Sequence, residues 1–168
     1  YQELRNADSS NKNKIDARYF QNDPIATAFE VMETCLSVEE GISMLLKIIG
    51  MRFHLDRISI IDMNLNDLTA AHAYCWTKDA SVFCFKNEFS FSKEEFRHIF
   101  QLRDDTGIIE LNADAVDSKM PIVSKAIKFT NAKNILLAPM FWQGQMVGVM
   151  TFSVCQKTRH WSKHTKQQ

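Results

Sequence analysis

The fold of this chain is decided near its end, by a stretch that reads Lys133-Asn134-Ile135-Leu136-Leu137-Ala138-Pro139-Met140-Phe141-Trp142-Gln143-Gly144-Gln145-Met146-Val147-Gly148-Val149-Met150-Thr151-Phe152-Ser153-Val154-Cys155. Its two apolar runs flank Gln143-Gly144, a pair that is typical of a tight turn between antiparallel strands. The residues Arg159-His160-Trp161-Ser162 follow and indicate the first turn of a helix. A hairpin of this kind needs a larger sheet around it, and we expect a domain that is truncated in its C-terminal helix.

Length and composition fit one globular domain. The chain has 168 residues, of which 45% are hydrophobic and 24% are charged. Its 20 basic residues balance its 20 acidic ones, so we expect no nucleic-acid partner. The apolar runs are too short to span a bilayer, and the sequence shows no signal-peptide pattern. We therefore expect a cytoplasmic domain, whose parent protein can still be anchored in a membrane elsewhere.

Polarity divides the chain into two parts. Residues 1–22 are rich in Asn, Ser and Lys, which predicts a linker or a partly helical segment. Residues 23–168 carry the domain. Their periodicity predicts helices over 23–36 and 37–53, strands over 57–63, 68–77 and 82–89, a helix over 91–102, a strand over 107–111, a helix over 121–129, and the terminal hairpin. Strands joined by hairpins, with helices between some of them, indicate an antiparallel α+β sheet of six strands.

Three helix starts carry recognisable capping residues. Asp23-Pro24 combines a capping carboxylate with Pro at the first helical position. The segments Ser37–Glu40 and Phe91–Phe96 each contain the spacing of a capping box. Phe91 and Phe96 are also spaced as a hydrophobic staple, which predicts that their rings touch.

In this order the elements resemble a GAF domain, the sensory module related to PAS domains. The segment Leu55-Asp56-Arg57-Ile58-Ser59-Ile60 is similar to the family's entry into its first strand. A second similarity is to the closing hairpin of the family, which resembles Ala138-Pro139-Met140 followed by Gly144 and Val147-Gly148-Val149. More narrowly, three parts of the chain resemble the GAF domains of bacterial signalling proteins. They are Leu55 to Ser59, Tyr74-Cys75-Trp76, and the series Phe152, Cys155, Arg159 and Trp161. These domains often sit just before diguanylate cyclase or related output domains.

The resemblance implies a sheet with the N- and C-terminal helices on one face and short helices or loops over the other. It also implies a sensory or regulatory domain of a bacterial multidomain protein, in cyclic-di-GMP signalling. Such a domain would bind a small molecule, form a homodimer through its terminal helices and relay a signal to a covalently linked output domain such as diguanylate cyclase. The Asn-Lys-Phe-Asp-Glu signature of the cyclic-nucleotide members cannot be laid on this chain, and bilin-attaching cysteine contexts are not evident. We therefore expect no cofactor.

Strand geometry selects a candidate pocket. A turn centred between Asp79 and Ala80 would pair the strands over 68–77 and 82–89, with alternate side chains on opposite faces. One face would then be aromatic, and it would lie beneath the helix over 91–102. The candidate ligand-binding residues are His72, Tyr74, Trp76, Phe83 and Phe85 on the strands, with Phe96 and Phe100 on the helix. The alternative interpretation is an aromatic core that binds nothing.

The four cysteines are Cys35, Cys75, Cys84 and Cys155, and no two of them form a CxxC pair. Their scatter favours reduced, buried thiols. The expected strand register nevertheless sets Cys75 opposite Cys84, near the range of a disulfide. A thiol-based redox enzyme or sensor is therefore an alternative function, besides a ligand-free dimerisation or spacer module.

Catalysis and metal binding have little support in the sequence. There is no GxSxG, Walker, HExxH or GxGxxG motif, so we do not expect an enzyme. Strict alternation would point His72 and Cys75 to opposite faces of one strand, so we expect no metal site there.

Overall fold

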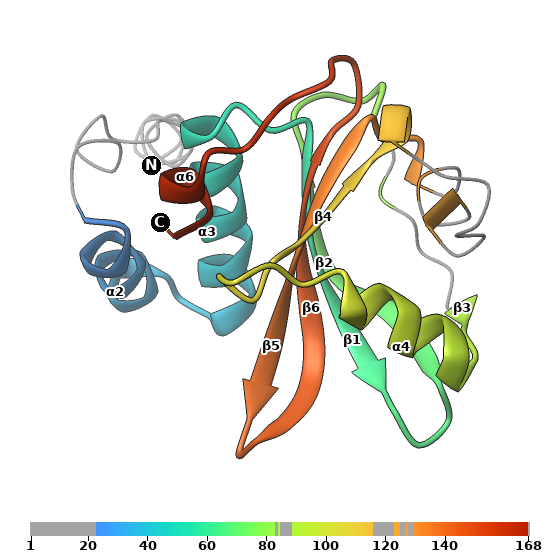
Figure 1. Ribbon diagram of the computed structural model, residues 1–168. Coiled ribbons are helices and arrows are strands. Elements are labelled where there is room, and N and C mark those ends of the chain that lie inside the picture. The colour runs from blue at the N-terminus through green and yellow to red at the C-terminus, as the bar shows by residue number, and fades with distance from the viewer. Residues whose placement is uncertain are drawn as a thin grey trace, which may run out of the picture.

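The computed structural model describes residues 23–82, 84, 89–115, 123–124, 127 and 130–167 (Figure 1). The linker expected over 1–22 and the candidate residues Phe83 and Phe85 lie outside the described residues. Most of the helix expected over 121–129 also lies outside them, although the described residues Val123, Ser124 and Ile127 are helical.

The strands form one antiparallel sheet in the order β3-β2-β1-β6-β5-β4. Its members are β1 (Arg57–Asn64), β2 (Thr69–Thr77), β3 (Phe89–Ser90), β4 (Ile109–Asn112), β5 (Asn134–Trp142) and β6 (Gln145–Val154). The antiparallel α+β architecture is thus confirmed. The strand expected over 82–89 is wrong in its position, because Val82 and Cys84 are not in strand conformation. In its place the two-residue β3 pairs with the start of β2, so the sheet has five full strands and one short edge.

Helices cover both faces of the sheet. Figure 1 shows α2 (Pro24–Thr34), α3 (Val38–Arg52) and α6 (Lys163–Gln167) on one side and α4 (Lys93–Gln101) on the other. A short 3-10 helix, η2 (Ala113–Ala115), follows β4. None of the helices in the described part of the chain is long and apolar enough to cross a membrane.

The predicted N-cap residues are present, but the capping box predicted at Ser37–Glu40 is incomplete, because the Glu40 carboxylate accepts from the Leu36 N–H instead of the Ser37 N–H. The Asp23 carboxylate accepts a hydrogen bond from the Ile25 N–H at 2.7 Å, at the start of α2. The capping box of α4 is complete, since the Ser92 hydroxyl accepts from the Glu95 N–H and the Glu95 carboxylate accepts from the Ser92 N–H. These bonds satisfy backbone donors that a helix leaves without an internal partner. The predicted hydrophobic staple also forms, with the ring centroids of Phe91 and Phe96 5.7 Å apart.

The closing hairpin has the predicted turn. Trp142 pairs with Gln145, which leaves Gln143 and Gly144 as the two loop residues. Both have positive φ, 49° and 77°, as a type I′ turn requires. The twist of this turn matches that of the flanking strands, so the long β5–β6 pair can run on into the sheet.

The core between the sheet and α3 depends on a close contact of helix and strand. Leu46, Leu55, Ile58 and Val154 are buried there, and the Trp76 ring packs against them. A Cβ atom at Gly50 would lie 2.0 Å from the Trp76 ring. Glycine at this position therefore lets α3 approach β2 closely enough for the indole to cover its backbone.

We predict that Gly50→Ala lowers the free energy of unfolding by about 1–3 kcal/mol, because the new methyl group must displace the rigid Trp76 ring. Gly41→Ala, in the same helix, is the matched control. Its Cβ would meet the flexible Met32 side chain, and alanine also favours the helix by about 1 kcal/mol. Urea unfolding of both variants measures the difference. Equal stability of the two variants would contradict the proposed packing constraint.

Candidate ligand-binding cavity

A cavity of about 150 Å³ lies between α4 and the sheet. Its floor comes from all five full strands, and the helix supplies one wall. The lining is mostly apolar and includes Ile61, Met63, Ala70, Phe91, Phe96, Ile99, Phe100, Ile109, Leu111, Ile135, Leu137, Pro139, Met146 and Val149. Five polar side chains join it, namely Arg57, His72, Glu95, Thr130 and Thr151. A mostly apolar concavity with a few polar groups is typical of a small-molecule site.

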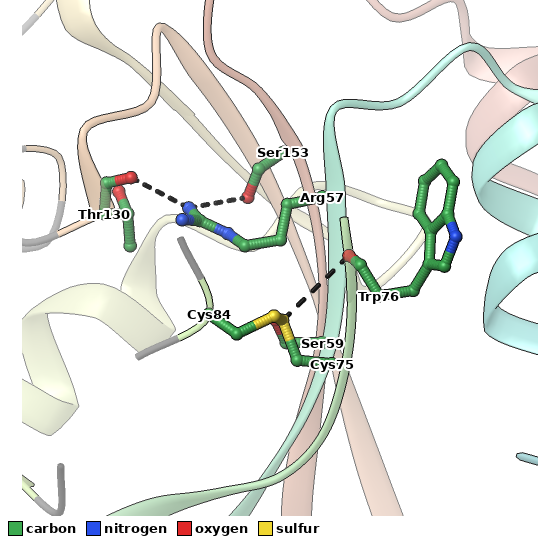
Figure 2. Close-up of a disulfide and its surroundings, with 7 residues drawn as sticks. All are labelled: Arg57, Ser59, Cys75, Trp76, Cys84, Thr130 and Ser153. Carbon is green, nitrogen blue, oxygen red and sulfur yellow. Dashed lines mark hydrogen bonds between the residues drawn. A yellow bond between two sulfur atoms is a disulfide. The ribbon is translucent and has the colours of Figure 1, made fainter. Parts of the chain in front are cut away.

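Arg57 is the most deeply buried of these polar residues, with 2% of its surface exposed. Its Nη2 donates to the Thr130 carbonyl oxygen at 2.9 Å and lies 3.4 Å from the Ser153 hydroxyl, as Figure 2 shows. Burial lowers the pKa of this guanidinium, and the nearby Cys155 thiol opposes that effect. A buried cation is expensive to desolvate, so Arg57 needs these acceptors to stay in the cavity wall.

His72 is the second titratable group of the cavity. It lies on β2 opposite Ile61, which is also a lining residue. Burial lowers the pKa of His72, and the positive charge of Arg57 lowers it further. The imidazole is therefore biased towards its neutral form, which can both donate and accept a hydrogen bond.

The side chains of β2 do not follow the strict alternation expected from the sequence. Ile60 pairs with Tyr74 and Ile61 pairs with His72, so Ala73 is an extra residue in the register. Such a bulge shifts the side-chain phase of one strand against its neighbour. On one side of the bulge His72 faces the cavity, and on the other side Tyr74 and Trp76 face α3.

The predicted aromatic face is therefore wrong as a single surface. His72, Phe96 and Phe100 line the cavity as expected. Tyr74 and Trp76 pack in the opposite core with Ile58, because the bulge reverses their direction. Arg57 and the aliphatic residues of β4, β5 and β6 also line the cavity, and the strand pattern had not predicted them. The alternation of Arg57, Ile61 and Met63 along β1 was a signal that could have identified part of this floor.

The bulge also brings Cys75 to the cavity side of the sheet, next to Arg57. Cys75 and Cys84 form a disulfide, with their Cα atoms 6.0 Å apart (Figure 2). The expected proximity of the two cysteines is thus found, although Cys84 does not lie in a strand paired with β2, and the expectation of reduced thiols is wrong for this pair. The Ser59 hydroxyl lies 3.4 Å from the Cys75 sulfur and can donate to it. His72 and Cys75 share a face rather than pointing apart, as strict alternation had implied.

The remaining cysteines are free but show no sign of activation. Burial raises the pKa of Cys35, with Glu40 adding to the shift. Burial also raises the pKa of Cys155, where Arg57 opposes the shift and Asp56 adds to it. A reactive thiol needs a lowered pKa. Within the described ranges, no group of three or more His, Cys, Asp or Glu side chains could hold a metal ion.

Solved structures of GAF domains have the same fold as this chain. The phycocyanobilin-bound GAF domain of a cyanobacterial phytochrome is 12% identical, with a TM-score of 0.66 and 86% of each chain covered. A far-red-absorbing dark state with bound biliverdin is 11% identical, with a TM-score of 0.67, covering 86% of this chain and 90% of the other. The GAF domain of an Acinetobacter phosphoenolpyruvate-protein phosphotransferase is 10% identical, with a TM-score of 0.60, covering 90% and 85%. No protein-family model and no curated protein matches the sequence.

These structures confirm the GAF fold that the sequence resembles, and they correct one expectation. Two of the three hold a bilin chromophore, so the fold of this chain occurs with a bound cofactor. The expectation of no cofactor, drawn from missing sequence contexts, is therefore overturned.

The disulfide predicts a specific thiol count. Denatured, unreduced protein should give two reactive thiols per chain with Ellman's reagent, from Cys35 and Cys155, and four after reduction. Lysis in acid keeps the native redox state, because protonated thiols do not exchange with disulfides, and it leaves the free thiols available to the reagent once the pH is raised in denaturant. Four thiols without reduction would contradict the disulfide.

His72 predicts a dependence of stability on pH. Because its pKa is lowered in the folded protein, the unfolded chain takes up a proton first when the pH falls below about 6.5. The free energy of unfolding should therefore decrease below that pH, and it should decrease less in His72→Gln. Urea unfolding at pH 8 and pH 5.5 measures this. His98→Gln, on the exposed side of α4, should behave as the wild type.

Proposed function

We propose that this chain is a sensory domain that binds an apolar small molecule in the cavity between α4 and the sheet. The observation that carries the proposal is the lining of this cavity, which is mostly aliphatic and aromatic and is joined by five polar side chains, those of Arg57, His72, Glu95, Thr130 and Thr151. Apolar walls provide binding energy, and a few polar groups set orientation. We propose a sensory rather than a catalytic role, because neither free cysteine lines the cavity and the phycocyanobilin-bound GAF domain of a cyanobacterial phytochrome shares this fold.

A conjugated ligand of the bilin class is the first candidate, of which the cavity of about 150 Å³ would hold one or two rings while the rest projects from it. Similar structures hold phycocyanobilin and biliverdin within this fold. In this chain the lining contains three aromatic rings that can stack on a planar ligand, those of Phe91, Phe96 and Phe100. No cysteine is among the described lining residues, so the ligand would be held without a covalent bond.

The signalling context extends the proposal. We propose that the domain pairs as a homodimer through its terminal helices and relays its state to a linked output domain, such as a diguanylate cyclase. The apolar stripe on α2 and after it supports an interface there. Its side chains are largely exposed: Ile25 (68%), Phe29 (69%), Met32 (39%), Leu36 (87%) and Val38 (58%). Exposed apolar patches of this kind mark interaction surfaces.

The cavity is tested with 1-anilinonaphthalene-8-sulfonate, a dye that fluoresces in apolar sites, and with biliverdin, whose visible absorbance changes on binding. We expect both to bind the wild type. We expect Ala70→Leu to weaken binding about tenfold, because Ala70 is 2% exposed and its enlarged side chain would fill the cavity.

The matched control is Phe29→Ser, which removes an exposed ring of α2 and should leave binding unchanged. Circular dichroism checks that each variant folds. Dye binding that is insensitive to Ala70→Leu and lost in Phe29→Ser would place the dye on α2. The proposed sensor would then fail, and a ligand-free dimerisation module would stand in its place.

Thiol-based redox sensing is a second candidate, favoured by the Cys75–Cys84 disulfide on the cavity side of the sheet. The two sulfurs would cycle between a disulfide and two thiols, with a low-molecular-weight thiol as the reductant. Arg57 lies beside the disulfide, and its positive charge would stabilise a thiolate there. The thiol count predicted above tests whether the oxidised form exists in the native protein.

A further inference from the structure

The C-terminal helix is held by one lysine that contacts two carboxylates. The Nζ atom of Lys166 lies 2.8 Å from Asp104 Oδ2 and 2.8 Å from Glu110 Oε2. Its side chain is only 12% exposed, against 32% for Asp104 and 25% for Glu110. Partly buried ion pairs are screened less by solvent and salt than exposed ones. This cluster therefore fixes α6 to the loop between α4 and β4 and to β4 itself.

Asp104 uses its two carboxylate oxygens for different tasks. Oδ1 accepts from the Thr106 N–H at 2.9 Å and from the Ile108 N–H at 3.3 Å, which shapes the loop before β4. Oδ2 accepts from Lys166. The hydrogen bonds from Lys166 and Thr106 lower the pKa of Asp104 far below its usual value. Burial opposes the charge on Lys166, but its bonds to the two carboxylates prevail and raise its pKa.

Both carboxylates are attached to walls of the cavity. Asp104 follows the C-terminal end of α4 after Leu102 and Arg103, and Phe100 in the last turn of this helix is a lining residue. Glu110 lies on β4 between Ile109 and Leu111, which are buried and line the cavity. Alternation along β4 turns Glu110 away from the cavity, towards Lys166. The Asp104 N–H donates to the Ile108 carbonyl oxygen at 2.9 Å and Arg103 forms a bridge with Ile109, so Asp104 and Glu110 belong to one hydrogen-bonded unit at the start of β4. A shift of this unit, whose Ile109 and Leu111 line the cavity, is therefore transmitted to Lys166 and α6.

We propose that Lys166, through Asp104 and Glu110, couples occupancy of the cavity to the position of α6. The rest of the C-terminal segment packs on the face of the sheet that α3 covers. The Arg159 N–H donates to the Asn134 side chain at 2.6 Å, and the Arg159 guanidinium donates to the Phe53 carbonyl and stacks on Trp161. The Lys166 cluster is thus a direct connection from the cavity walls to the end of this segment.

The inference rests on the proposed ligand cavity, and thermodynamic reciprocity makes it measurable. If a ligand in the cavity changes the strength of the ion pairs between Lys166 and the two carboxylates, then removing these ion pairs must change the affinity of the cavity for the ligand by the same factor. Lys163 supplies a matched control. Lys163 lies on the same helix as Lys166 and pairs with Asp105. The two side chains are 63% and 68% exposed, and ion pairs that are so exposed contribute little to stability.

The experiment is a titration of the wild type, Lys166→Met and Lys163→Met with 1-anilinonaphthalene-8-sulfonate, with Ala70→Leu as the test of where the dye binds. We expect Lys166→Met to change the dissociation constant at least about threefold and Lys163→Met to leave it unchanged. Hydrogen–deuterium exchange over residues 156–167 should respond to the dye in the wild type and in Lys163→Met, but not in Lys166→Met.

The outcomes separate the two proposals. Dye binding that Ala70→Leu does not weaken overturns the proposed cavity function and this inference with it. Binding that Ala70→Leu weakens, with equal dissociation constants in the wild type and Lys166→Met, overturns the coupling alone. Circular dichroism of Lys166→Met confirms that the variant is folded, and Lys166→Arg, which keeps the charge, should restore part of the response.

Discussion

Because Ala73 is an extra residue in the pairing of β2 with β1, the side chains of β2 change faces midway along the strand. The rest of the architecture depends on this change. Before the bulge, Ala70 and His72 form part of the cavity floor. Beyond it, Tyr74 and Trp76 fill the space under α3, and the Gly50 backbone lies against the Trp76 ring. A strand without the bulge would place either His72 in the apolar core or the indole ring in the cavity.

Buried polar groups gather at the end of the sheet where β1 begins and β6 ends. Asp56 is 6% exposed, and its carboxylate accepts from the Cys155 and Gln156 N–H groups at 2.7 and 3.4 Å. Arg57, the next residue, points to the cavity side and binds Thr130 and Ser153. Neighbouring residues of opposite charge thus hold chain segments on opposite faces. Each has acceptors or donors in place, which is the condition under which buried charge is tolerated.

Local signals in the sequence were sufficient for much of the fold. Gln143-Gly144 predicted the hairpin turn, and the residues around Ser92 predicted a capped helix, because both depend on contacts within a few residues. The cavity was predictable only in part. The positions of Phe96 and Phe100 follow from helix periodicity. The direction of the Trp76 side chain depends on a bulge, which is set by the packing of both faces of the sheet at once and which no local sequence pattern indicates. The cofactor expectation failed for a related reason, since local motifs diverge faster than the fold.

The bulge in β2 also bears on how a module of this kind can diversify. Residues 70–72 contribute to the cavity, whereas residues 74–76 contribute to helix packing and to the disulfide. A substitution at residue 70 or 72 can therefore alter the cavity without touching the contacts that Tyr74 and Trp76 make beneath α3. The extra residue Ala73 separates these two halves of the strand, so each half can tolerate changes that the other would not.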